Sequence, residues 1–113
     1  MYLDQKKILD SLTDEDIIKI CAELGSPEYK HDSQGNLCFS TAICHGGDSP
    51  YKLTYYHDSH RFKCWTCSDS YGIIELVIRA HRLKGKTLTY YRALYYIASM
   101  TGRLYEKDPE QIA

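Results

Sequence analysis

The sequence predicts an α+β fold, in which a small ribbon of antiparallel strands is flanked by N-terminal and C-terminal helices. Two observations predict it: strand patterns separated by turn residues fill the middle of the chain, and helical apolar periodicity lies on both sides. The 113 residues suit one domain. We assign residues 1–103 to it, and 104–113 to a charged tail or an artificial chain end.

The N-terminal part predicts two helices. The first covers Met1 to Asp10 and is short. The second begins after Thr13, which forms a capping-box pattern with Asp16, and it ends at Gly25. Its apolar stripe consists of Ile17, Ile20, Cys21 and Leu24. Cys21 is therefore expected in the core.

Three strands and two further helices follow. The expected strands are Leu37–Ile43, Tyr51–Tyr56 and Arg61–Trp65, with turn clusters at 31–36, 46–50 and 57–60. A helix is expected over 72–84. A last helix begins after Thr87 or Thr89 and is closed by Gly102.

Charge is unevenly distributed along the chain. Residues 1–60 carry five basic and ten acidic side chains, a balance of −5, whereas residues 61–103 carry eight basic and two acidic ones, a balance of +6. Such asymmetry suggests a surface that faces a polyanion, although solvated helix faces produce it too.

Composition also excludes several classes of protein. No apolar run approaches the roughly 20 residues of a membrane span, and the polar N-terminus is not a secretion signal. We therefore expect a cytoplasmic protein without a membrane partner. In that reducing compartment the five cysteines are poor disulfide candidates.

Cysteine spacing predicts a metal site. Cys64 and Cys67 form a C-x-x-C pair directly after a strand, a spacing at which two thiolates bind one tetrahedral Zn²⁺. A thioredoxin-like redox pair is the alternative, but it normally lies in a βαβ unit. An antiparallel hairpin precedes the pair here, which favours zinc over redox chemistry.

The second ligand pair is predicted at Cys44 and His45. Neighbouring residues of an extended strand point to opposite sides, so both can bind one ion only where the turn twists the chain. Along such a strand Cys38 would lie about 20 Å from Cys44, which argues against Cys38 as a ligand. The fourth ligand stays open, with Asp48, His57 and His60 as reserve donors.

One face of the ribbon combines aromatic and basic side chains. Because strand side chains alternate, Lys52 and Tyr56 share a face of one strand, and Arg61, Lys63 and Trp65 share a face of the next. Aromatic rings stack on bases and cations follow phosphates, so these five residues are candidates for nucleic-acid binding. In a small ribbon, aromatics also serve merely to cover the core. The opposite set, Tyr51, Leu53, Tyr55 and Phe62, is expected to pack on the helices.

Together these motifs resemble the zinc-binding domain of bacterial and phage DNA primases. The resemblance rests on Cys44-His45, on Pro50 five positions after the histidine, on the aromatic residue before Cys64-Trp65-Thr66-Cys67, and on the helices around the ribbon. It covers about residues 13–102. The family's first cysteine would fall at Ala42, its glycine after the last cysteine is Ser68, and an acidic residue before the final helix's alanine is Arg92.

The resemblance implies a non-catalytic module that binds Zn²⁺ and single-stranded DNA template. Such a module acts with a separate primase polymerase domain or a replicative helicase in primer synthesis and DNA replication. The alternative is a stand-alone phage or mobile-element zinc protein that binds and regulates a host protein. The chain has no acidic constellation for Mg²⁺ and no glycine-rich phosphate loop, so we expect no enzymatic activity from it.

Overall fold

A computed structural model describes residues 2–47 and 49–107 of the chain. It confirms the α+β fold, with a five-stranded antiparallel sheet in the order β1-β2-β3-β4-β5. The elements in chain order are α1 (Gln5–Asp10), α2 (Asp14–Leu24), β1 (Lys30–His31), β2 (Leu37–Phe39), the 3₁₀ helix η1 (Thr41–Ile43), β3 (Leu53–Tyr56), β4 (Arg61–Cys64), β5 (Ser70–Tyr71), α3 (Ile73–Leu83) and α4 (Tyr90–Met100).

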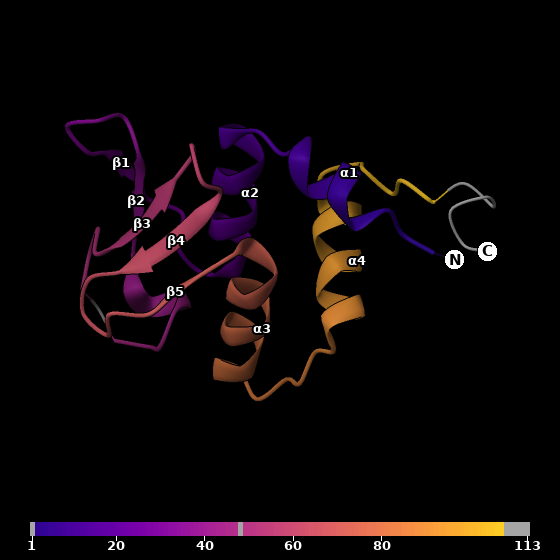
Figure 1. The fold of residues 1–113 in the computed structure, drawn as a ribbon. Helices are drawn as coiled ribbons and strands as arrows, with labels where there is room; N and C mark the ends of the chain where they lie inside the picture. Colours follow the sequence, from indigo (N-terminus) through magenta and orange to yellow (C-terminus); the bar gives the residue numbers. More distant parts are fainter. Residues whose placement is uncertain (1, 48, 108–113) are drawn as a thin grey trace.

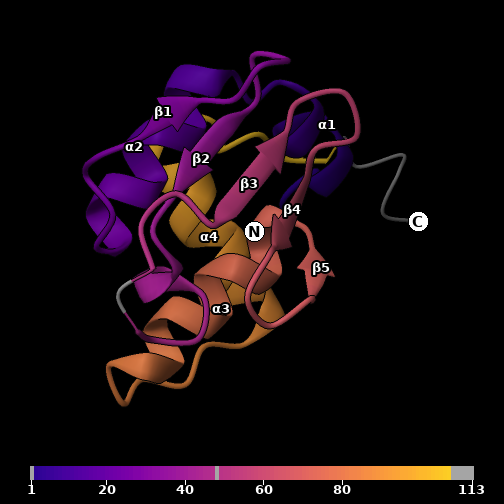
Figure 2. The same cartoon turned by 90° about the vertical axis from the view of Figure 1, so that its left-hand side faces the viewer.

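The helices cover one face of the sheet and leave the other face bare. Figure 1 shows α2 and α3 beside the sheet, with α4 and α1 on their far side. Figure 2 shows the bare face, with the strands lying across it in their order in the sheet. The covered face is fully buried at its centre, where Leu37, Phe39, Leu53, Tyr55 and Phe62 meet the helices.

The helix ends follow the predicted capping chemistry. Thr13 and Asp16 form a capping box at the start of α2, and Gly25 ends that helix with a positive φ of 127°. Thr89 caps α4 by accepting a hydrogen bond from the Arg92 amide. Cys21 is completely buried on α2, as expected.

The first predicted helix is shorter than expected. It begins at Gln5, because Asp4 caps it by accepting a hydrogen bond from the Lys7 amide. Leu3 instead forms a β-bridge with Glu106, which holds the two ends of the described chain together. Among the described residues, no helix is both long enough and apolar enough to cross a membrane.

All three predicted strands were too long, although the one predicted at 61–65 exceeds β4 by one residue only. The strand predicted at 37–43 ends at Phe39, because Ser40 accepts a hydrogen bond from the Ala42 amide and starts η1. The strand predicted at 51–56 begins only at Leu53, because Tyr51 has a positive φ of 61°. Tyr51 therefore does not pack on the helices as predicted: its ring lies 4.6 Å from Lys30 Nζ.

Candidate metal centre

Two separate segments bring the predicted metal ligands together. Cys44 and His45 follow η1, and Cys64 ends β4 and leads into the turn that carries Cys67. The backbone of Cys44 is helical rather than extended, with φ −98° and ψ −66°. Adjacent side chains therefore need not point to opposite sides, and Cys44 and His45 reach the same point.

The spacing of the four ligand atoms fits a tetrahedral ion. Their side-chain donor atoms all lie within 4.8 Å of one another. Two sulfurs bound to one Zn²⁺ at about 2.3 Å lie about 3.8 Å apart, and a sulfur and a nitrogen about 3.6 Å apart. The Cys44 and Cys67 sulfurs are 3.8 Å apart, and Cys64 Sγ is 3.7 Å from His45 Nδ1. The cluster can therefore hold a metal ion, and three sulfurs with one nitrogen are a donor set typical of structural zinc.

Neighbouring hydroxyl groups hold the ligands in place. The Tyr71 hydroxyl donates to Cys44 Sγ at 2.7 Å. Thr66 Oγ1 lies 3.2 Å from Cys64 Sγ and 3.3 Å from His45 Nε2. Thr66 thus contacts both the Cys64 sulfur and His45 Nε2, the ring nitrogen on the side away from that sulfur. A hydrogen-bond partner in this position fixes the ring orientation of a histidine ligand.

The surroundings shift the thiol pKa values in opposite directions. Burial raises the pKa of the Cys44 thiol to about 12, although the Tyr71 hydroxyl donates to its sulfur. Burial also acts to raise the pKa of Cys64. There the Thr66 hydroxyl and the backbone amides of Cys67 and Thr66 outweigh it, and the pKa falls to about 6. A metal ion bound by both sulfurs would take them as thiolates, so binding would displace the proton that burial favours on Cys44.

Three of the four other donor candidates lie elsewhere. Cys38 is buried on β2, where its sulfur is 3.7 Å from Thr54 Oγ1, and it does not join the cluster. His57 lies 3.5 Å from Asp58, and His60 Nδ1 lies 3.0 Å from the Tyr55 hydroxyl. Asp48 lies outside the described residues.

Four of the five candidate nucleic-acid residues lie on the bare face of the sheet, along the β3–β4 hairpin and directly after it. Tyr56 pairs with Arg61 across the strands, and Thr54 pairs with Lys63. The Trp65 indole donates to Thr54 Oγ1 at 3.2 Å while 58% of the residue stays exposed. Lys63 Nζ lies 5.7 Å from the Trp65 ring.

The fifth of these residues, Lys52, is exposed and lies next to Trp65. Its carbonyl accepts a hydrogen bond from the Trp65 amide at 2.9 Å. We call Lys52, Tyr56, Arg61, Lys63 and Trp65 the sheet-face cluster. One of its members, Trp65, directly follows Cys64 of the candidate metal centre.

Sequence reasoning missed Thr66 and Tyr71, which surround the metal ligands. A threonine inside a C-x-x-C pair gives no signal by spacing alone. Tyr71 belongs to β5, a two-residue strand too short for a periodic pattern. Its position becomes visible only through its pairing with Phe62 of β4.

A prophage-derived protein is similar in sequence to this chain. The SPbeta prophage-derived uncharacterized protein YorJ of Bacillus subtilis (strain 168) is 41% identical over 107 residues. The match covers 93% of this chain and 28% of YorJ, so the chain spans little more than a quarter of the length of this relative. No family model and no solved structure matches the chain.

Proposed function

We propose that this chain is a zinc module that binds single-stranded DNA template and acts with a separate polymerase domain in primer synthesis. One observation carries the proposal: the sheet-face cluster adjoins the candidate metal centre, because its member Trp65 directly follows Cys64. A metal that fixes the Cys64–Cys67 turn would also fix the position of the Trp65 ring.

The chemistry of the cluster supports a single strand as its ligand. An exposed aromatic ring stacks on any base, at roughly 1–3 kcal/mol per base. Arg61 and Lys63 lie on the same strand before Trp65, so the phosphates of a nucleic acid that crosses the Trp65 ring can approach them. The side chains of Arg61 and Lys63 donate to the main-chain carbonyls of Ser70 and Ser68, each at 3.0 Å. These contacts hold the cations along the sheet without neutralising their charge. Stacking and unneutralised charge side by side suit single strands of mixed sequence.

We further propose that the module is not a catalyst. Four protein ligands complete the tetrahedral coordination of a zinc ion, so no coordination position is left for a substrate or an activated water. Nucleotide transfer would come from a partner, a primase polymerase domain with its own Mg²⁺ site or a complex with a replicative helicase. The greater length of YorJ is compatible with a longer protein around such a module.

Binding of short single strands to the zinc-loaded chain tests the proposal by fluorescence anisotropy. Removing Arg61 and Lys63 (both to Ala) should lower the affinity and reduce the slope of log affinity against log salt by about 1.4, because each lost phosphate contact removes about 0.7. Trp65→Ala should weaken the binding free energy by roughly 1–3 kcal/mol. It should hardly change the salt slope, because stacking is not an ionic interaction.

A control variant removes the same number of positive charges at a different place on the surface. Lys6 and Lys19 are exposed residues of α1 and α2, away from the sheet face. Their double alanine variant should bind DNA like the parent. Equal losses in both double variants would mean nonspecific charge attraction, and no binding by the parent would refute the proposal.

The second candidate function is regulation of a host protein by a stand-alone phage or mobile-element protein. It is favoured by the exposed tyrosines of α4, since Tyr90, Tyr91 and Tyr95 each keep more than 40% of their surface exposed. Exposed apolar patches mark interaction sites. A host protein recovered with the zinc-loaded chain, and lost in Tyr95→Ala but retained in Trp65→Ala, would favour this function.

A further inference from the structure

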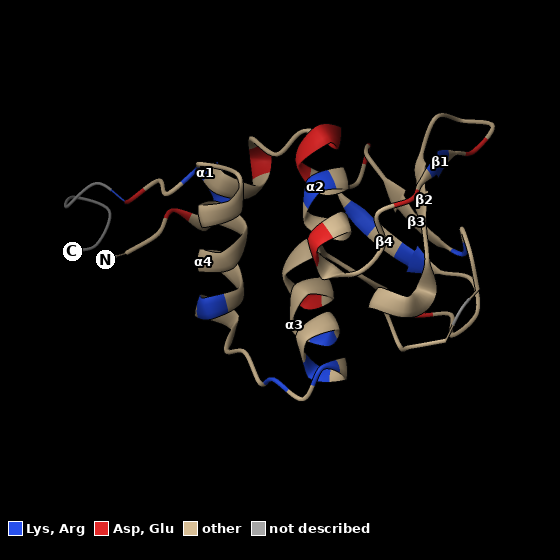
Figure 3. Ribbon diagram, turned by 180° about the vertical axis from the view of Figure 1, so that it is seen from behind, with Lys and Arg blue, Asp and Glu red and all other residues tan. Residues whose placement is uncertain are grey.

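Four exposed cations gather where α3 ends and α4 begins: Arg82, Lys84, Lys86 and Arg92. Figure 3 shows this corner in blue, without a red segment among the residues that form it. Residues 76–105 contain no Asp or Glu. We call these four residues the corner cluster.

The corner cations lack the carboxylate partners that other arginines have. Arg79 pairs with Asp69 at 3.0 Å and Glu75 at 3.3 Å, and Arg103 pairs with Asp16 at 2.9 Å. Within 2–47 and 49–107, no side chain of the corner cluster forms an ion pair. The corner is therefore a concentration of unneutralised positive charge.

Helix stability does not explain all of this charge. Arg82 and Lys84 lie at the C-terminal end of α3, where cations complement the helix dipole. Arg92 lies in the first turn of α4, where a cation is unfavourable and no acidic residue compensates it. Because the α4 dipole disfavours a cation at this position, the presence of Arg92 there suggests that it binds an external anion.

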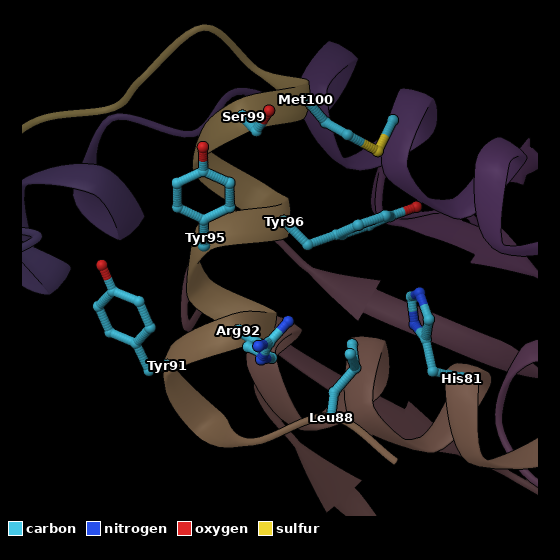
Figure 4. A pocket seen from close by; sticks show the side chains of 8 residues that line it. All are labelled: His81, Leu88, Tyr91, Arg92, Tyr95, Tyr96, Ser99 and Met100. Atoms are coloured by element: carbon cyan, nitrogen blue, oxygen red, sulfur yellow. The ribbon is translucent and has the colours of Figure 1, made fainter. Parts of the chain in front are cut away.

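A groove of about 500 Å³ opens beside Arg92. Figure 4 shows the Arg92 side chain between the rings of Tyr91 and Tyr95 on one side and those of Tyr96 and His81 on the other. Tyr91 is 46% and Tyr95 43% exposed, so aromatic surface is accessible next to the cation. No acidic side chain lines this groove in the part of the chain that the structure describes.

The corner also adjoins the metal centre. A Cβ on Gly46, next to the ligand His45, would lie 3.9 Å from a methyl group of Leu83 at the end of α3. The loop that supplies Cys44 and His45 therefore contacts the helix end that carries Arg82 and Lys84. A nucleic acid that leaves the sheet-face cluster along this loop would therefore come to the end of α3.

We infer that the corner cluster is a second contact site for the same single-stranded nucleic acid. Lys84, Lys86 and Arg92 would contact its phosphates, and Tyr91 or Tyr95 would stack on a base. The inference rests on the proposed function, because it extends the path of a strand that is bound first at the sheet face. Because a strand must be long enough to contact both sites, the binding affinity should depend on strand length.

Strands of two lengths test the inference with the zinc-loaded chain. We choose about 4 and about 16 nucleotides, the limits of the site size of small single-strand-binding folds. The triple variant Lys84→Ala, Lys86→Ala, Arg92→Ala should bind the short strand like the parent. For the long strand its salt slope should fall by about 2, because three phosphate contacts are lost. Tyr95→Ala should weaken binding of the long strand alone, at nearly unchanged slope.

The matched control is the triple alanine variant of Lys6, Lys19 and Lys107, three exposed lysines outside the corner. It should bind both strands like the parent, and circular dichroism should show that both triple variants are folded. Parent-like binding of the long strand by the corner variant would overturn the inference but not the proposed function. So would an acidic peptide that binds the parent, but not the corner variant, while DNA binding is unchanged. Failure of the parent to bind either strand would overturn both.

Discussion

Cys38 and Cys44 are two buried thiols six positions apart with different surroundings. Cys38 lies on β2, where its sulfur is 3.7 Å from the Thr54 hydroxyl oxygen. Cys44 faces two other cysteines and a histidine, and Tyr71 donates to its sulfur. The contrast comes from the backbone between them, which leaves the strand at Ser40 and turns through η1. It separates a buried thiol of the sheet from a candidate metal ligand without any difference in side-chain type.

Serine variants of two cysteines should separate these roles. Cys64→Ser should lose the metal, because a hydroxyl is a far weaker zinc ligand than a thiolate. Cys38→Ser should retain about one zinc per chain. Metal analysis of the purified variants gives the answer. Metal retained by Cys64→Ser, or lost by Cys38→Ser, would contradict the ligand assignment.

At the scale of elements, the start of α2 joins two distant parts of the chain. Asp16 accepts hydrogen bonds from the Thr13 amide and hydroxyl, and it pairs with Arg103 beyond the end of α4. Partial burial acts to raise the pKa of this carboxyl, but the hydrogen bonds from Thr13 and the charge of Arg103 outweigh it and lower the pKa. The ionised form is therefore stabilised by folding.

Asp16→Asn should reduce the free energy of unfolding at neutral pH by about 1 kcal/mol, the usual cost of a lost helix cap. Because the folded pKa is lowered, the carboxylate stabilises the parent above the ordinary value of 3.8, and this contribution is lost as pH falls through the folded pKa. The difference in free energy of unfolding between parent and variant should therefore become smaller as the pH falls below the ordinary value of 3.8. Denaturant unfolding at several pH values measures it, and a gap that widens in acid would be contrary to expectation.

Local signals of the sequence were sufficient for most elements and for the four residues that cluster in the candidate metal centre. The Thr13 cap, the stop at Gly25 and the alternation of Leu53, Tyr55 and Phe62 all depend on neighbouring residues, which the sequence displays directly. The turn at η1 depends on Ser40, whose amide donates to the distant Ser26 hydroxyl at 3.0 Å. Strands β1 and β5 depend on pairing partners, and two residues cannot show a period. These features could not be predicted because tertiary contacts create them.

At the scale of the whole molecule, the metal centre and the core share residues. Cys44 and Cys64 belong to the buried cluster that includes Phe62, Tyr71 and Leu76. A structural zinc contributes roughly 10–16 kcal/mol of apparent binding free energy in small domains. Loss of the ion would therefore affect the sheet, and through α3 the helices packed on it.

Removal of zinc with a chelator should unfold the sheet and loosen the helices. Circular dichroism and amide hydrogen exchange would follow the change, and added Zn²⁺ should reverse it. Exchange should increase first in β4 and in the loop after η1, which supply the ligands. A chelated chain with parent-like exchange throughout would mean that the core folds without the ion.

The position of Trp65 gives the chain an intrinsic optical reporter. It is the only tryptophan of the sequence, and excitation at the red edge of its absorption band avoids the eleven tyrosines. Its indole is exposed, bonded to Thr54 and adjacent in sequence to Cys64. Its emission should therefore respond both to a base stacked on the ring and to the state of the neighbouring thiolate, so that one unlabelled sample can be titrated with either ligand.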